Sequence, residues 1–305
     1  MKVLAYRELD SKDDLLPLLD QAFNWIFDES QFSDTIKIDP RLKNSPVGFC
    51  ALENDKVIGY VGVMDLVTRT LEDTHEQVGG LYGVATLPEF TRRGVFSTLI
   101  VKAHDYFKER GYRFSFLGTS PALVAHHLYE KLGYADVVEY PSAYKVVGSK
   151  SRNAHVEGLA SAFEPQRMLN IYNIATKRMT GLVVRDLAYL NMLRKVEAIK
   201  PRHILIEDEG YVVFRKEKAT TWVRELIATG KKGTERLVTA IEQKTKAIVY
   251  NRAILDKTLL KVYRSRDYII QEKGYAVMMC KPLTGDVSFT QTYGDKFFLS
   301  RLDSF

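Results

Sequence analysis

The sequence predicts an α/β protein made of two related domains, and three observations support this class. Strand-like and helix-like periodicities alternate through the first half of the chain. Landmarks of the first half recur in the same order in the second half. The third observation is size, because 305 residues exceed what one ordinary domain holds. A composition with 46% hydrophobic and 27% charged residues also excludes a wholly disordered chain.

The sequence pattern of the first half predicts alternating strands and helices. Residues 96–107 carry one apolar stripe at helical spacing, which Gly111 can end. Residues 47–52 and 57–65 flank a polar turn at 53–56 and predict a β-hairpin. The expected strands are 3–9, 47–52, 57–70, 77–86, 112–117 and 143–147, and the expected helices are 11–23, a piece within 24–46, 96–110 and 121–132.

The second half resembles a repeat of the first. Residues 203–214 predict a hairpin with an acidic turn, as residues 49–60 do, and residues 262–268 echo residues 128–134. Chance is the alternative, but two landmarks in the same order favour duplication. The other expected elements are two helices within 164–196, a strand at 220–228, a helix at 237–245 and a strand at 247–250. The expected organisation is a first domain at 1–148, a linker at 149–158, a second domain at 159–282 and a tail at 283–305.

Composition argues against several other classes of protein. No run of eighteen apolar residues occurs, and the N-terminus becomes charged too soon for a signal peptide, so we expect no membrane association. Two distant cysteines, Cys50 and Cys280, form neither a disulfide framework nor a metal cluster. The six histidines show no metal-ligand spacing. We therefore expect a cytoplasmic protein without a metal.

Charge is shared unevenly between the halves. Residues 1–150 carry a net charge of −4, and residues 151–305 a net charge of +10. A basic half can serve a nucleic acid, an anionic cofactor or only a solvated surface. The basic residues are scattered, which favours the solvated surface. The absence of an RNA-recognition, zinc-finger or clear helix-turn-helix signature argues against a nucleic-acid partner.

The most informative stretch is residues 82–100, where a strand meets a proline, two arginines, a glycine and a helix. The first amides of a helix lack internal partners, and the helix dipole adds positive potential there, so such a turn can bind an anion. Gly94 removes a side chain where the backbone must approach a phosphate, and Arg92 and Arg93 add charge for a diphosphate. The alternative is an ordinary loop with two exposed arginines.

This stretch, followed by Leu128-Tyr129-Glu130-Lys131-Leu132-Gly133-Tyr134, resembles the GNAT superfamily of acyl-CoA N-acyltransferases. That family carries R/Q-x-x-G-x-G/A at the strand-to-helix turn and L-Y-x-x-x-G-F/Y on the following helix. Thr91 replaces the usual Arg or Gln, and Phe96 replaces the second small residue. The R-R-G variant is similar to the enhanced-intracellular-survival acetyltransferases, which carry a second, degenerate GNAT domain. The resemblance implies tandem GNAT-like domains, each a mostly antiparallel mixed sheet flanked by helices.

The resemblance also implies a site for acetyl-CoA. Tyr129 would be the general acid that protonates the leaving thiolate. The strand residues Gly83, Val84 and Ala85 would splay from the neighbouring strand and bind the pantetheine and the thioester carbonyl. The pyrophosphate would lie on the main-chain amides of Arg93, Gly94, Val95, Phe96, Ser97 and Thr98.

The implied reaction is direct acetyl transfer to a primary amine of a small molecule or peptide. Nothing beside Cys50 resembles an activating base, which argues against a covalent intermediate. The alternative is a non-catalytic module that senses acyl-CoA. Acidic residues around the second hairpin strand would suit a cationic acceptor or form a solvated hairpin: Asp65, Glu72, Asp73 and Glu76. The acceptor and the oligomeric state, including a homo-oligomer, stay open.

The second half lacks a comparable turn. Residues 230–234 occupy the corresponding place, but no proline precedes them, and no lysine follows their second glycine as a P-loop requires. We therefore expect a helix start without cofactor, and a structural Tyr263.

The tail is apolar up to its last residue, so we expect it to be docked rather than disordered. The resemblance implies that it docks near the active site. In the enhanced-intracellular-survival branch, a terminal phenylalanine supplies the base through its carboxylate, and Phe305 is the matching position. A terminal carboxylate is a weak base in water, so desolvation or a water relay would have to help. The alternative is a tail strand that only packs on the second domain.

Overall fold

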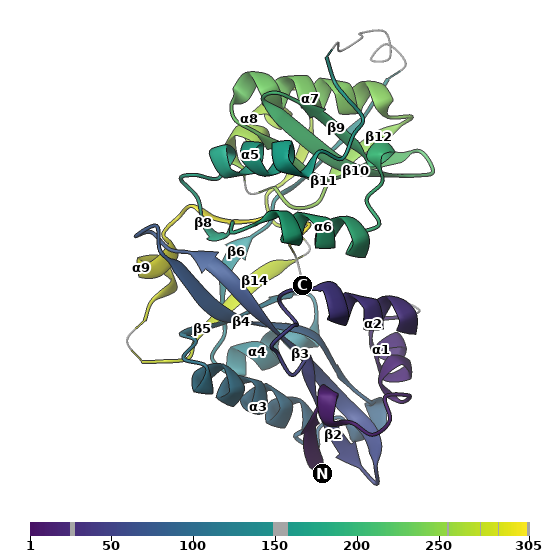
Figure 1. The fold of residues 1–305 in the computed structure, drawn as a ribbon, viewed down its shortest axis with the longest axis vertical. Helices are drawn as coiled ribbons and strands as arrows, with labels where there is room; N and C mark the ends of the chain where they lie inside the picture. Colours follow the sequence, from purple (N-terminus) through teal and green to yellow (C-terminus); the bar gives the residue numbers. More distant parts are fainter. Residues whose placement is uncertain (25–27, 149–157, 255, 275, 286, 304–305) are drawn as a thin grey trace. The chain divides into compact units, whose positions relative to one another are not determined.

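The computed structural model describes residues 1–24, 28–148, 158–254, 256–274, 276–285 and 287–303. Within these residues the chain divides into two compact units (Figure 1). The first unit comprises residues 1–137 and 278–292, and the second comprises residues 138–277 and 293–303. Most of the expected linker at 149–158 lies outside the described residues. None of the helices in the described residues is long and apolar enough to cross a membrane.

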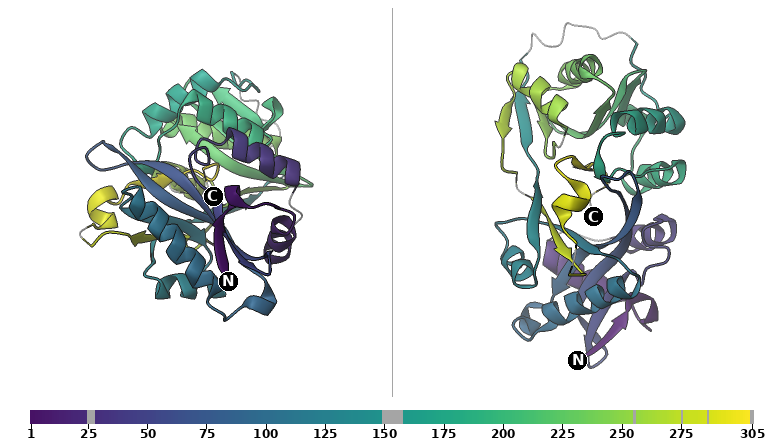
Figure 2. Two further views of the ribbon diagram at one scale, coloured as in Figure 1. Left: turned by 60° about the horizontal axis from the view of Figure 1, so that its bottom comes forward. Right: turned by 90° about the vertical axis from the view of Figure 1, so that its left-hand side faces the viewer.

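The first unit is a mixed sheet with helices on both faces. Its elements are β1 (Lys2–Ala5), η1 (Tyr6–Glu8), α1 (Leu15–Phe23), α2 (Glu29–Ile38), β2 (Gly48–Glu53), β3 (Lys56–Arg69), β4 (His75–Thr86), η2 (Pro88–Phe90), α3 (Val95–Glu109), β5 (Phe114–Thr119), α4 (Val124–Lys131), β6 (Ala135–Glu139), β14 (Val277–Pro282) and α9 (Phe289–Tyr293). The strand order is β1-β2-β3-β4-β5-β14-β6. Helices α1 and α3 lie on opposite faces of this sheet (Figures 1 and 2).

The hairpin between β2 and β3 confirms the turn expected at residues 53–56. Asn54 and Asp55 both have positive φ angles, 51° and 61°. This is the pattern of a turn that matches the twist of a two-stranded hairpin, and Asn and Asp tolerate it well. The two strands pair antiparallel from Gly48–Gly62 to Glu53–Lys56.

Glycines allow α3 to pack closely on the sheet. A Cβ atom on Gly79 would lie 2.4 Å from the Phe107 ring, and one on Gly59 would lie 2.6 Å from Val95. Because the larger partners on α3 are buried, they fill the space that the missing side chains leave. The predicted apolar stripe of this helix therefore packs against β3 and β4 at positions where the strands carry glycine.

The second unit repeats this arrangement. Its elements are β7 (Ser142–Val146), α5 (Pro165–Ala175), β8 (Thr180–Leu182), α6 (Leu187–Val196), η4 (Pro201–His203), β9 (Ile204–Glu207), β10 (Gly210–Glu217), β11 (Thr220–Ala228), α7 (Lys231–Lys244), β12 (Ile248–Asn251), α8 (Lys257–Ser265), β13 (Ile269–Gln271) and β15 (Phe297–Leu299). The sheet order is β13-β7-β12-β11-β10-β9. The succession β9-β10-β11-α7-β12-α8 matches β2-β3-β4-α3-β5-α4, so the predicted class of two α/β sheets with flanking helices is confirmed.

Strands β7 and β14 lie in a different sheet from the one that sequence order implies. β7 falls within the expected first domain at 1–148, yet it pairs with β12 and β13 of the second unit. β14 falls within the expected domain at 159–282, yet it lies between β5 and β6 of the first unit. Both strands are short, so periodicity cannot tell which sheet takes which strand.

Part of the expected tail is ordered by strand pairing. β15 pairs in parallel with β8 through Phe297–Thr180 to Leu299–Leu182. Phe297, Phe298, Leu299 and Leu302 are buried. Burial of these side chains accounts for the apolar pattern of the tail.

Candidate functional site

The parallel strands β4 and β5 pair over a short stretch only. Residues 79–81 face residues 115–117 in the ladder. β4 continues to Thr86 and β5 to Thr119, and no further ladder pair joins them in the described residues. Main-chain groups of β4 beyond Leu81 therefore lose their neighbour on this side, at the stretch where the sequence places Gly83, Val84 and Ala85.

A β-bulge shapes the same stretch of β4. Gly83 and Val84 together oppose one residue of β3, because Tyr60 pairs with Ala85 and Gly62 with Tyr82. Gly83 has φ +57°, which a glycine adopts at little cost. A bulge of this kind redirects the backbone locally and is frequent beside active sites.

No local sequence pattern predicts the hydrogen bonds that support this bulge. The Tyr82 hydroxyl donates to the carbonyl of Val47 at 2.8 Å, and the Tyr60 hydroxyl lies 3.2 Å from the Tyr82 hydroxyl. Val47 has φ +67°, which is a strained conformation for a β-branched residue. The Val63 amide donates to the same carbonyl at 3.0 Å. These bonds hold a strained loop against the bulge.

The turn after β4 presents exposed main-chain amides at the start of α3. Gly94 is the residue before the helix, with φ +80°, and no side chain caps the helix start. Arg92 also has a positive φ, 59°. Thr91 to Gly94 are exposed, as are Ser97 and Thr98, whereas Val95 is buried and Phe96 half-buried. The geometry is that of an uncapped helix N-terminus accessible to an anion.

The two arginines of the turn have different surroundings. Arg93 forms an ion pair with Glu53 of β2 at 2.6 Å and lies over the Phe90 ring at 4.8 Å. Its charge is therefore largely balanced by a partner forty residues away in sequence. Arg92 is exposed, and no ion-pair partner for it occurs in the described part of the chain. Arg92 is the better placed of the two to add positive charge at the turn.

Tyr129 lies on α4 with 5% of its surface exposed. Its ring packs on Phe96 at 5.2 Å and on Tyr134 at 5.7 Å. No hydrogen-bond partner of its hydroxyl occurs among the described residues. Burial raises the pKa of Tyr129 above its ordinary value, so the phenol keeps its proton at neutral pH. Phe96, which departs from the family pattern, contacts the residue expected to be the acid.

Tyr134 is in turn fixed by two buried polar side chains. Its hydroxyl lies 2.8 Å from His104 Nε2 and 2.6 Å from the Ser115 hydroxyl. Burial lowers the pKa of His104 to about 3, so the imidazole is neutral at physiological pH. This chain of bonds reaches from α3 and β5 to the ring that packs against Tyr129. His104 looks like an ordinary residue of the apolar stripe in sequence, so this role had no visible signal.

The corresponding place in the second unit is built differently. Gly230, before α7, has an extended backbone with φ −167°. Tyr263, which matches Tyr129, is 1% exposed, and its hydroxyl accepts a hydrogen bond from Asn251 at 3.3 Å. Tyr263 belongs to an apolar cluster with Leu226, Leu237 and Leu259. Side chains therefore fill the region that faces α7 and α8.

Several sequence-predicted residues have partners that reduce their availability for an acceptor. Asp65 pairs with Arg110 at 3.5 Å, and Glu76 pairs with Arg113 at 2.7 Å. Burial raises the pKa of the Cys50 thiol to about 12, so it is not a thiolate at neutral pH. Phe305 lies outside the described residues, and its expected role stays a prediction.

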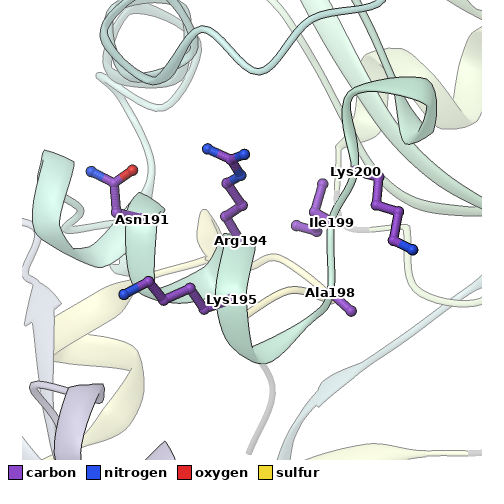
Figure 3. A pocket seen from close by; sticks show the side chains of 6 residues that line it. All are labelled: Asn191, Arg194, Lys195, Ala198, Ile199 and Lys200. Atoms are coloured by element: carbon purple, nitrogen blue, oxygen red, sulfur yellow. The ribbon is translucent and has the colours of Figure 1, made fainter.

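The second unit also has a pocket with a volume of about 600 Å³ at the end of α6. Figure 3 shows the side chains of Arg194, Lys195 and Lys200 pointing away from one another. They do not converge on one position, so they do not form a single anion site. The lining residues are Asn191, Arg194, Lys195, Ala198, Ile199 and Lys200. No group of three or more His, Cys, Asp or Glu suited to a metal ion occurs among the described residues.

Comparison with known proteins finds a family match within the first unit. Residues 12–134 match the model of the acetyltransferase (GNAT) family. A GCN5-related N-acetyltransferase from Kribbella flavida is similar in structure, with a TM-score of 0.70 and 17% identity over 92% of this chain and 72% of that one. Eis1 from Mycobacterium abscessus gives a TM-score of 0.64 and 17% identity over 93% and 74%.

A GCN5-related N-acetyltransferase from Anabaena variabilis gives a TM-score of 0.66 and 17% identity over 93% of this chain and 73% of that one. No curated protein sequence matches the chain. At such identities the structural likeness concerns the fold, which supports the α/β class expected from the sequence.

Proposed function

Since residues 12–134 match the model of the acetyltransferase (GNAT) family, we propose that the chain transfers the acetyl group of acetyl-CoA to a primary amine by direct attack. The observation that carries the proposal is one juxtaposition in the first unit. β4 loses its β5 neighbour after Leu81, and the same strand then leads into the uncapped start of α3. The first feature offers main-chain groups to a thioester, and the second offers amides to a pyrophosphate.

In this proposal the amides of residues 93–98 hold the pyrophosphate, and Gly83, Val84 and Ala85 bind the pantetheine and polarise the thioester carbonyl. The exposure of the turn supports the first assignment. Arg92 contributes charge, whereas Arg93 serves mainly to fix the turn through Glu53. The bulge at Gly83 supports the second assignment, because it turns the backbone where pairing to β5 has ended.

Tyr129 is the proposed general acid. The amine nitrogen attacks the thioester carbon, the carbon–sulfur bond breaks, and the thiolate takes the phenolic proton. Burial keeps this phenol protonated, and the phenol lacks a competing acceptor among the described residues. The amine proton leaves to a base, for which the family resemblance offers the carboxylate of Phe305.

The second unit is proposed to act without a cofactor of its own. Its turn at Gly230 is extended, and Tyr263 is packed and hydrogen-bonded. The packing and the hydrogen bond of Tyr263 support a structural role for that residue. The acceptor is assigned only by class, as a primary amine of a small molecule or peptide.

The experiment is a thiol-release assay with acetyl-CoA and a panel of amines. Tyr129→Phe keeps the ring between Phe96 and Tyr134 and removes the proton donor. Turnover should fall by roughly 10²–10⁴-fold, with the KM for acetyl-CoA nearly unchanged. Tyr263→Phe is the matched control in the second unit and should leave turnover unaltered.

Two outcomes would contradict the proposal. Full turnover by Tyr129→Phe, with the chemical step shown to limit the rate, would remove Tyr129 from the mechanism. Binding of CoA without turnover of any amine would favour a sensor over an enzyme.

A further inference from the structure

The face of the second sheet that points away from α7 and α8 carries a row of aromatic side chains. Trp222 pairs with Tyr250 across β11 and β12, and Tyr250 pairs with Tyr144 across β12 and β7. Directly paired residues share a face, so these three side chains, here called the aromatic row, lie together. Their ring centroids are 4.9 Å apart for Trp222–Tyr250 and 6.4 Å for Tyr144–Tyr250.

The aromatic row is open to solvent in part. Trp222, Tyr250 and Tyr144 are all half-buried. Their strand neighbours Val223 and Val249 point the other way and are buried in the cluster beneath α7 and α8. The sheet therefore separates a filled core from a partly exposed aromatic surface.

Arg252 places a positive charge on this row. It follows β12 directly, and its guanidinium lies 4.6 Å from the Trp222 ring centre and 5.8 Å from that of Tyr250. Arg252 is exposed, and no carboxylate in the described residues pairs with it. The Trp222 indole N–H is buried without an acceptor in that same part of the chain.

Other arginines lie close to the row, and one of them is balanced by a carboxylate. Arg224, two residues after Trp222 on β11, forms an ion pair with Glu197. Burial, together with the charges of Arg224 and Arg252, lowers the pKa of the Arg301 guanidinium. The surface therefore combines stacking faces with positive charge that attracts an anion.

We propose that the aromatic row and Arg252 bind a small molecule in which a flat aromatic ring carries a carboxylate or a phosphate. The ligand ring lies against the face of one of these side chains and the edge of the other, because the planes of Trp222 and Tyr250 are inclined at 71°. The anionic group accepts hydrogen bonds from Arg252, whose planar guanidinium fits either anion with two parallel bonds. This assignment concerns the second unit alone and does not depend on acetyl transfer by the first.

The test uses benzoate and phenyl phosphate as probes of the full chain. Trp25→Phe leaves Trp222 as the only tryptophan, so indole fluorescence then reports this surface. We expect saturable quenching by both probes. The probe that binds with the lower Kd shows whether the surface prefers a carboxylate or a phosphate. Calorimetric titration of the unaltered chain provides a second measurement that does not depend on the reporter variant.

Substitutions distinguish a specific binding site from general attraction of an anion to the basic second unit. Arg252→Gln should raise the Kd of the better probe by about 10-fold or more, and Arg252→Lys by less. Arg215→Gln is the matched control, because Arg215 pairs with Trp222 in register from β10 but is already bound to Glu217 at 2.9 Å. This control should leave the Kd unchanged.

Three results would overturn the proposal. Equal binding of benzyl alcohol would show that the anion has no role. Equal loss of affinity in Arg215→Gln and Arg252→Gln would show that only overall charge matters. Much tighter binding of a single-stranded oligonucleotide than of phenyl phosphate would assign this surface to nucleic acid instead.

Discussion

His104 is neutral inside the first unit because it is buried beside Tyr134, and its pKa is lowered to about 3. An imidazole in an unfolded chain has a pKa near 6.5. Between these two values the unfolded chain binds a proton that the folded chain does not. The free energy of unfolding must therefore decrease as the pH falls from about 6.5 towards 3. Above pH 6.5 the imidazole is neutral in both states, so His104 adds no pH dependence there.

The corresponding prediction concerns His104→Gln, which keeps a polar group near the Tyr134 hydroxyl but cannot be protonated. Through His104 alone, the unaltered chain should lose about 2 kcal/mol of unfolding free energy between pH 8 and pH 5. The variant should lack this part of the pH dependence in urea denaturation curves. Exposed His75→Gln is the control. Identical pH slopes for the His104 variant and the unaltered chain would refute the assignment.

At the scale of elements, a buried charge cluster joins three segments of the second unit. Arg185, after β8, pairs with Glu225 of β11 and with Asp303 of the tail, each at 2.7 Å. The Tyr211 hydroxyl also donates to Glu225 at 2.7 Å, and the Arg185 guanidinium lies 4.0 Å from the Tyr172 ring centre. All three charged side chains are at least 96% buried, so each depends on the others to offset its lost hydration.

Replacing the arginine alone should therefore lower the unfolding free energy strongly, while replacing all three charged side chains should lower it much less. Arg185→Met leaves two buried carboxylates without a cation and should lower the unfolding free energy by about 3–5 kcal/mol. Adding Glu225→Gln and Asp303→Asn should recover much of this loss. Urea denaturation followed through Trp222 fluorescence, in a Trp25→Phe background, reports on this unit. No recovery in the triple variant would show that the loss came from packing and not from unpaired charge.

Sequence patterns predicted the elements well wherever one residue type decides the local backbone. The hairpin at Asn54-Asp55, the apolar stripe of α3 and the turn at Gly94 were all expected and observed. Boundaries moved where tertiary contacts compete: the strand expected at 3–9 ends at Ala5, and a short 3₁₀ turn follows it. The Arg185 cluster joins residues up to 118 positions apart, and such pairing has no local signal.

At the scale of the whole molecule, the sequence predicted two similar halves but not the exchange of β7 and β14 between their sheets. Both strands are short, and the placement of each depends on neighbouring strands that lie more than a hundred residues away in the sequence. The candidate site also combines residues that a local motif predicts with contacts that only the folded sheet brings together. Gly83, Gly94 and Tyr129 could be chosen from a local motif, whereas the pairing of Arg93 with Glu53 and the support of Tyr134 by His104 require the folded sheet.

The difference between the two helix starts predicts one acetyl-CoA site per chain. Ser97→Asp places a carboxylate in the exposed first turn of α3, where the helix dipole tolerates it but a pyrophosphate would be repelled. Lys232→Asp makes the matched change in the first turn of α7. Calorimetric titration should give one CoA per unaltered chain, binding weakened by at least about 10-fold in Ser97→Asp, and unchanged binding in Lys232→Asp. Ser97→Ala controls for loss of the hydroxyl that bonds the Gly94 carbonyl. Two equivalent sites, or equal weakening by both aspartates, would mean that the second unit also binds CoA despite its extended turn and its buried Tyr263.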